Sequence, residues 1–173
     1  LAAYFAQMSR SVQNDMDCRG CAAKFPAEPL QDSLALANFS NLGNQPEDAF
    51  LIDTFKGGES IFQSVDGFPA LVSDPWLNGR LTALHACSDL WAMGASVASA
   101  QVVITLPKVS ENIQKEFLAQ SLLGIKSALA PQEAKLIGGH TIEARSDCPQ
   151  PSSFGIQIAL CINGFLSSGM RSW

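Results

Sequence analysis

The residues with the clearest potential for chemistry lie near the start of the chain, in the segment CRGCAAK. It contains Cys18, Cys21 and Lys24. The C-x-x-C spacing suits half a zinc site or a redox disulfide, whereas Cys21 with Lys24 offers a thiol and an ammonium group that can face a phosphate. The sequence has no second C-x-x-C or histidine pair to complete four zinc ligands, and the motif precedes the regular elements instead of opening a helix within a βαβ unit. The zinc and dithiol interpretations are therefore the weaker ones.

A second group of polar residues lies at the ends of apolar segments. Asp48 opens one expected strand, Asp66 closes another, and Asp89 follows His85 by four residues on one face of an otherwise apolar helix. A carboxylate buried there without a partner would cost several kcal/mol, so it requires a cation, a metal or a hydrogen-bond network. Aspartates with few bases nearby suit Mg²⁺, which takes oxygen ligands and usually shares them with substrate phosphates.

The segment GGHT, residues 138–141, adds a glycine pair whose backbone N–H groups can bind a phosphate. Each of these features also has a plainer interpretation. Asp48 and Asp66 are also typical of turns at strand ends, His85 of a packed core histidine, and the glycine pair of an ordinary turn.

Hydrophobic patterning predicts the elements that position these residues. Helices are expected at 27–39, 79–93 and 111–129, and strands at 48–55, 60–66, 96–107, 134–140 and 154–164. Gly57 and Gly58 favour a tight hairpin, the helix at 79–93 should be buried, and the strand at 134–140 should run into a glycine turn. The order predicts an α+β fold, a mixed and mainly antiparallel sheet with two helices packed on one face. Polar residues on the other face suit a second subunit.

Composition excludes several classes of function. The chain has 173 residues and a net charge of −5, without a basic cluster, which argues against nucleic-acid binding. No apolar run approaches the roughly 20 residues of a membrane helix. Five cysteines without a secreted framework favour a reducing cytoplasm. Because the chain begins at leucine, we expect a fragment of a longer protein, with a tail at 1–17, one domain at 18–166 and the start of a link to a missing domain at 167–173.

The segment SVDGFPALVSDPWLNGRLTALHACSDLWAMGA resembles the central block of the selenophosphate synthetases, members of the aminoimidazole-ribonucleotide synthetase superfamily of ATP-using enzymes. The family pattern is an aspartate-phenylalanine segment, an aspartate-proline turn, Gly-Arg, and a helix ending in Ser-Asp-x-x-Ala-Met-Gly. GGHT is similar to the family's second nucleotide-contacting loop, and the early Cys/Lys motif lies at the corresponding distance. The resemblance spans residues 18 to about 165.

The resemblance implies a reaction in which ATP, selenide and water give selenophosphate, AMP and phosphate. Cys21 and Lys24 would be catalytic, with Lys24 against the phosphates. Asp48 and Asp89 would hold Mg²⁺ ions that bridge the triphosphate, and Asp89 would thereby also contact the nucleotide. The remaining nucleotide contacts implied are Asp66, Gly138, Gly139, His140 and Thr141. We also expect a homodimer.

Several departures from the family pattern matter. Glu47-Asp48 stands where many members have two aspartates, His85 stands where many carry asparagine, and the family's C-terminal half is absent. The C-x-x-C spacing is similar to enzymes fused behind an oxidoreductase domain, so such a fusion is expected. Alternatives are another ATP-using enzyme of the superfamily, or a non-catalytic nucleotide-binding or dimerisation module.

Overall fold

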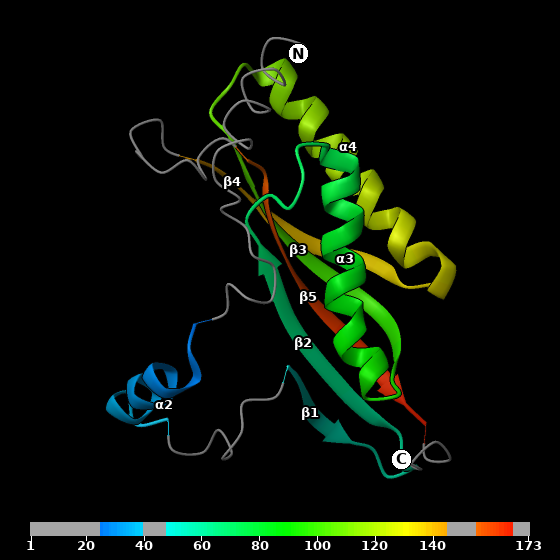
Figure 1. Cartoon of the computed structure of the whole chain (residues 1–173). Helices are drawn as coiled ribbons and strands as arrows, with labels where there is room; N and C mark the ends of the chain where they lie inside the picture. The colour runs from blue at the N-terminus through cyan, green and yellow to red at the C-terminus, as the bar shows by residue number, and fades with distance from the viewer. Residues whose placement is uncertain (1–24, 40–47, 145–154, 168–173) are drawn as a thin grey trace.

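A computed structural model describes residues 25–39, 48–144 and 155–167, which form one sheet with two long helices on one face. The helices are α2 (Ala27–Leu36), α3 (Pro75–Ala92), α4 (Glu111–Leu129) and the 3₁₀ helix η2 (Ala130–Gln132). The strands are β1 (Ala49–Thr54), β2 (Ser60–Phe68), β3 (Ser96–Leu106), β4 (Lys135–Glu143) and β5 (Gln157–Leu166). Figure 1 shows α3 and α4 over the same face of the sheet. The predicted α+β class and the helix placement are confirmed.

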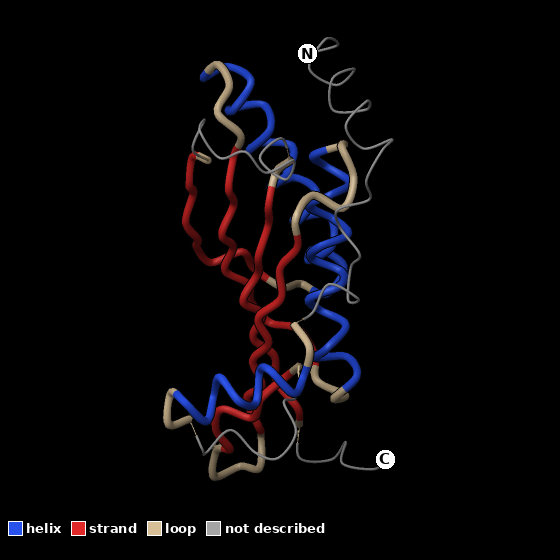
Figure 2. Tube along the Cα trace, turned by 60° about the vertical axis from the view of Figure 1, so that its left-hand side comes forward, coloured by secondary structure: helices blue, strands red, loops and turns tan. Residues whose placement is uncertain are grey.

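The five strands lie in the order β1-β2-β5-β3-β4. Only β3 and β4 are parallel, and α4 makes the crossover between them that a parallel pair requires. The other three pairings are antiparallel, so the sheet is mixed and mainly antiparallel as expected. Figure 2 shows the strands as one continuous twisted sheet, and Figure 1 shows α2 apart from α3 and α4. The last strand in the chain, β5, therefore lies at the centre of the sheet.

The hydrophobic core fills the space between the sheet and the two long helices. Period-2 alternation in β5 sends Ile158, Leu160 and Ile162 toward the helices, and all three are at most 1% exposed. Helix α4 supplies Ile125 and Leu129, which are equally buried. The hairpin from β1 to β2 turns through Gly58, whose φ of 83° is readily adopted only by glycine.

Helix α3 differs from the prediction at its start. It begins at Pro75, four residues earlier than expected, because Asp74 caps it by accepting a hydrogen bond from the Leu77 amide at 2.6 Å. Proline is favoured at the first helical position, where its missing N–H has no helical partner. The end of α3 is as predicted, because Gly94, which follows the helix, adopts the left-handed conformation at φ 74°.

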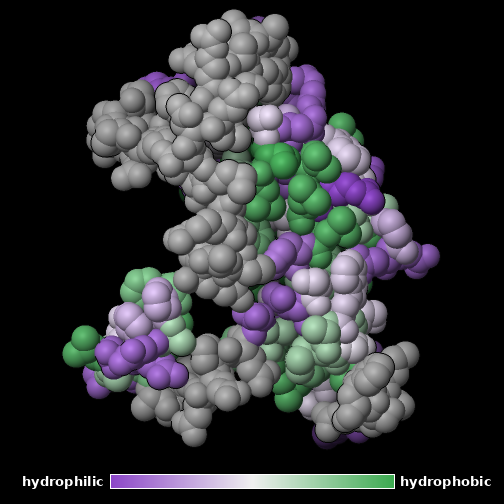
Figure 3. Space-filling view, viewed as in Figure 1, coloured by the Kyte–Doolittle hydropathy of each residue, from purple (hydrophilic) through white to green (hydrophobic). Residues whose placement is uncertain are grey.

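The expectation that α3 is buried all round is wrong. Two tight contacts with α4 bury one side, where a Cβ on Gly79 or Gly124 would collide with the backbone of the facing helix. On the outer side Leu77 and Leu81 are exposed, and Figure 3 shows hydrophobic surface gathered over the first half of the helix. The helix is therefore apolar over more of its circumference than this domain covers.

The predicted glycine turn after residue 137 is also wrong. Strand β4 continues through Gly138 and Gly139 to Glu143, in parallel register with β3. Ala100 pairs with Leu136 and Gln101 with Gly138, so Ile137 is an extra residue that shifts the register by one without ending the strand. GGHT is therefore part of a strand and not of a loop.

Candidate functional site

The polar layer lies between β2 and α3 and is built from two strand residues and two helix residues: Ser64, Asp66, His85 and Asp89. Alternation along β2 directs Ser64 and Asp66 to the same side as the buried Phe62 and Phe68, toward α3. Helical spacing places the other two on one face of α3. The plain strand and helix periods therefore bring together residues that lie about twenty positions apart in sequence.

Two hydrogen bonds join the strand to the helix in the polar layer. His85 Nδ1 lies 2.6 Å from Asp66 Oδ2, and the Ser64 hydroxyl donates to Asp89 Oδ2 at 2.8 Å. The side chain of Asp66 is 15% exposed and that of His85 is 32% exposed. The carboxylates thus have hydrogen-bonding partners and still reach the surface, as groups that meet a ligand must.

The structure brings the strand residue Asp66 together with His85 and Asp89, which the sequence places on one face of the helix. The backbone of Asp48 lies beside β2, because the following residue, Ala49, pairs with Ser64 across the β1–β2 ladder. Asp48 is exposed. No three histidine, cysteine, aspartate or glutamate side chains within residues 25–39, 48–144 and 155–167 converge closely enough to hold a metal ion by themselves. A metal here would need oxygen atoms from a ligand as well.

Ser64 is the member of the polar layer that the sequence reasoning did not single out. The signal was present, because Ser64 stands two residues before Asp66 in a strand and therefore on the same face. A small hydroxyl residue between buried phenylalanines also indicates a polar partner on the facing helix. That partner is Asp89.

GGHT lies on β4, at the edge of the sheet that is far from the polar layer. Strands β5 and β3 separate β2 from β4, and at about 4.8 Å per strand step this places β4 about 14 Å from β2. The structure thus does not bring Gly138–Thr141 together with Asp66 and Asp89 within one chain. The local sequence carries no information on this separation, because it depends on the strand order.

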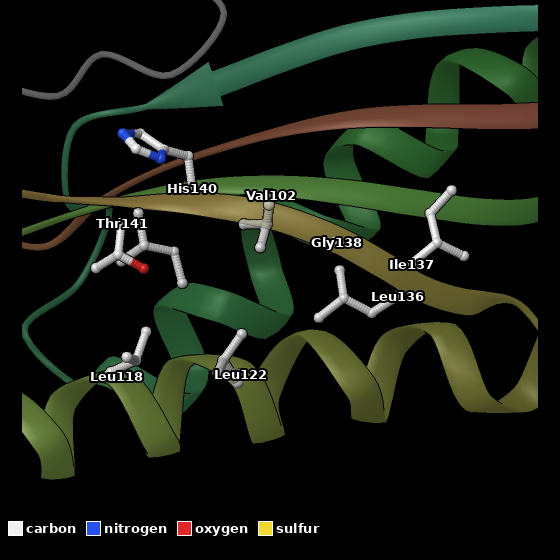
Figure 4. A pocket seen from close by; sticks show the side chains of 10 residues that line it. Val102, Leu118, Leu122, Leu136, Ile137, Gly138, His140 and Thr141 are labelled. Atoms are coloured by element: carbon white, nitrogen blue, oxygen red, sulfur yellow. The ribbon is translucent and has the colours of Figure 1, made fainter.

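An open groove lies along β4, on the side that faces α4. It has a volume of about 450 Å³ and is lined by Val102, Ile104, Leu118, Leu122 and residues 136–141. Figure 4 shows Leu118 and Leu122 of α4 directed toward β4, with Thr141 on that side and His140 on the other. The lining is mainly apolar, so this groove is not itself a triphosphate site.

The Cys/Lys motif lies outside the described residues, so the structure does not place Cys18, Cys21 or Lys24. Cys87 and Cys161 are both free thiols. Burial raises the pKa of both, that of Cys87 to about 11. Neither thiol is therefore activated as a nucleophile.

Comparison with known proteins places the chain in a family. The family described as AIR synthase related protein, N-terminal domain, matches residues 46–161. A selenide, water dikinase from Nitratidesulfovibrio vulgaris strain DP4 is 36% identical over 130 residues, which cover 75% of this chain and 35% of the relative. One from Clostridium botulinum strain Eklund 17B is 31% identical over 152 residues, covering 84% and 40%. The chain thus spans between a third and about two-fifths of the length of these relatives.

Solved structures share the fold at lower sequence identity. The AaThiL complex with AMPPCP and TMP has a TM-score of 0.63 and 15% identity, covering 84% of this chain and 45% of its own. The HypE–HypF complex gives a TM-score of 0.55 and 19% identity, covering 78% and 42%. No helix among the described residues is long and apolar enough to cross a membrane. The family match and the shared fold agree, and the chain therefore belongs to the AIR synthase related protein family and contains its N-terminal domain.

Proposed function

We propose that this chain is the ATP-binding domain of a selenide, water dikinase-like enzyme, which makes selenophosphate, AMP and phosphate from ATP, selenide and water. The polar layer is the single observation that carries the proposal, because it presents partnered carboxylates at the edge of an apolar core. The relatives named selenide, water dikinase support the choice of reaction.

Mg²⁺ would be held mainly by Asp48 and Asp89, with Asp66 holding the nucleotide beside them. The donor chemistry fits, because Mg²⁺ usually takes only one or two protein carboxylates and completes its shell with water and substrate phosphates. The absence of a three-ligand cluster among the described side chains agrees with such a site. When bound, the metal would neutralise charge on the triphosphate. The contribution of the chain is to hold one carboxylate directly before β1 and the other on the rigid helix α3.

Cys21 and Lys24 complete the proposed machinery. Lys24 would lie against the phosphates as a cation, and the Cys21 thiolate beside it would have a lowered pKa and would bind or relay selenium. Both roles come from the resemblance of CRGCAAK to the Cys/Lys motif of selenophosphate synthetases.

In a homodimer, the second copy could supply the remaining nucleotide contacts. Gly138, Gly139, His140 and Thr141 lie about three strand positions from Asp66 within one chain, which is far for a shared nucleotide. If a second copy placed its β4 along the first copy's edge strand β1, next to Asp48, GGHT of one chain would lie close to the carboxylates of the other. The exposure of all of β4 supports this arrangement.

The wider organisation follows from the same proposal. Residues 18–166 would form the nucleotide-binding domain after a tail at 1–17, and residues 167–173 would lead into a C-terminal domain. An oxidoreductase domain would precede the chain in the full-length protein. The free thiols Cys87 and Cys161 support work in a reducing cytoplasm.

Two measurements on the full-length protein test the proposed function. Millimolar Mg²⁺-ATP should raise the melting temperature relative to Mg²⁺ alone, because a ligand of the native state stabilises it. Phosphorus NMR with ATP and selenide should then show selenophosphate, AMP and phosphate. Absence of any shift in melting temperature contradicts nucleotide binding.

Another ATP-using activity of the superfamily is the second candidate, favoured by the similarity to the AaThiL complex with AMPPCP and TMP. ATP turnover without a selenophosphate signal would select it. ATP binding without turnover would select a non-catalytic module.

A further inference from the structure

His85 holds one oxygen of the Asp66 carboxylate, and the backbone holds the other. The carboxylate is an acceptor, so His85 Nδ1 donates to Oδ2 across 2.6 Å. The Gly67 amide donates to Oδ1 at 2.9 Å. Two donors from two elements therefore fix the rotation of the carboxylate at the end of β2.

The imidazole ring is itself fixed. Its centroid lies 4.6 Å from that of Phe68, with the two rings at 71°, an edge-to-face contact. Phe68 is 8% exposed and belongs to the same face of β2 as Asp66. Strand β2 thus contacts His85 at two alternate positions, one polar and one apolar, and both restrict where Nδ1 can point.

We propose that His85 is a positioning residue that orients Asp66 toward the nucleotide, and that the Nδ1–H group alone carries this role. The inference rests on the proposed function of the polar layer. A carboxylate held at both oxygens presents its remaining lone pairs in fixed directions, so binding does not have to order the side chain.

The chemistry of the side chains separates this role from simple packing. The amide nitrogen of asparagine branches from Cγ, as Nδ1 of histidine does, whereas that of glutamine lies one bond further, near the position of Nε2. His85→Asn therefore keeps a donor for Asp66 Oδ2, and His85→Gln removes it.

Calorimetric titration of the full-length protein with Mg²⁺-ATP tests the inference. His85→Asn should stay within about threefold of the wild-type dissociation constant, and His85→Gln should bind about tenfold more weakly. The melting temperature without ligand should fall in both, since both lose the contact with Phe68, and should fall further in His85→Gln, which also loses the hydrogen bond to Asp66. A structural role alone would move only that melting temperature.

Two results would overturn the inference: equal affinities for the two variants, or weaker binding by the asparagine variant. Long-range ¹H–¹⁵N NMR of the wild type without ligand is an independent test that needs no variant of His85. It should show a protonated Nδ1, and this signature should change in Asp66→Asn. A wild type that binds no Mg²⁺-ATP contradicts the proposed function itself, whereas wild-type binding unchanged in His85→Gln contradicts only the role of His85.

Discussion

The hydroxyl of Ser64 donates a 2.8 Å hydrogen bond to Oδ2 of Asp89, linking the middle of β2 to the last turns of α3. Ser64 is 2% exposed. The strand hydroxyl therefore compensates part of the cost of placing a carboxylate in an apolar helix.

Ser64→Ala should lower the free energy of unfolding by about 1–2 kcal/mol, because the Asp89 carboxylate loses a donor while remaining partly desolvated. Chemical denaturation measures this. Ser88→Ala is the matched control, since the exposed Ser88 hydroxyl only donates to the His85 carbonyl of its own helix. Equal effects of the two changes would mean that the Ser64–Asp89 bond contributes nothing.

Asp89→Asn should abolish most of the rise in melting temperature that Mg²⁺-ATP causes, because an amide is a poor replacement for an anionic Mg²⁺ ligand. Asp53→Asn should leave the rise unchanged. Asp53 is exposed and accepts a hydrogen bond from the neighbouring Thr54 amide, away from the polar layer. A normal rise in the Asp89 variant would remove that residue from the proposed site.

Gly139→Ala should destabilise the domain, whereas Gly138→Ala should be tolerated. A Cβ on Gly139 would collide with the Val102 carbonyl oxygen on β3, and one on Gly138 would meet open space. Overpacking of this kind costs about 1–3 kcal/mol, measurable by urea denaturation. If both variants were equally stable, β3 and β4 would not be paired as closely as described.

Cys87 makes stability depend on alkaline pH. Burial in the core raises the pKa of its thiol from 9.0 to about 11, against a smaller lowering by a hydrogen bond with Gln132. The folded state therefore holds the proton where the unfolded state releases it. The protonated thiol thus contributes about 2–3 kcal/mol to the free energy of unfolding. This contribution is complete below pH 9 and is lost as the pH rises through 11.

Urea denaturation of wild type and Cys87→Ala between pH 8 and pH 11 isolates this contribution. The alanine variant is less stable at pH 8 because it leaves a cavity. Its stability should nevertheless fall less steeply with pH, since the other titrating groups are common to both proteins. Parallel pH profiles would show that the thiol titrates alike in both states.

Cys21→Ser should abolish selenophosphate formation by the full-length protein, whereas Cys18→Ser should reduce it only mildly. The reason is that Cys21 has the spacing to Lys24 that the proposed machinery needs. Phosphorus NMR with ATP and selenide follows the product directly. Loss of the product on replacing Cys18, with Cys21→Ser still active, would exchange the roles of the two thiols.

Local patterns are enough to predict the faces on which Asp66, His85 and Asp89 lie, because these residues obey short periods. Asp66 ends a period-2 strand, and His85 and Asp89 are one helical turn apart, so each lies on a predictable face. Their convergence required only that α3 pack on β2.

The position of GGHT could not be predicted in the same way. Glycines favour turns locally, yet here the pairing with β3 extends the strand through them. The Val102 backbone on β3 lies so close to Gly139 that only a residue without a side chain fits there. The distance of this strand from Asp66 depends on β5 and β3 lying between, which is a property of the whole chain.

The central place of β5 has a consequence for biosynthesis. During translation, β1 to β4 leave the ribosome first, but β2 and β3 do not pair with each other and meet only through β5. Until Gln157–Leu166 emerges, the nascent chain has a β1–β2 hairpin and a β3–α4–β4 unit, and the edges of β2 and β3 that β5 later covers are unpaired. The last strand thus closes the domain, and a chaperone that shields those edges until then would raise the yield of native protein.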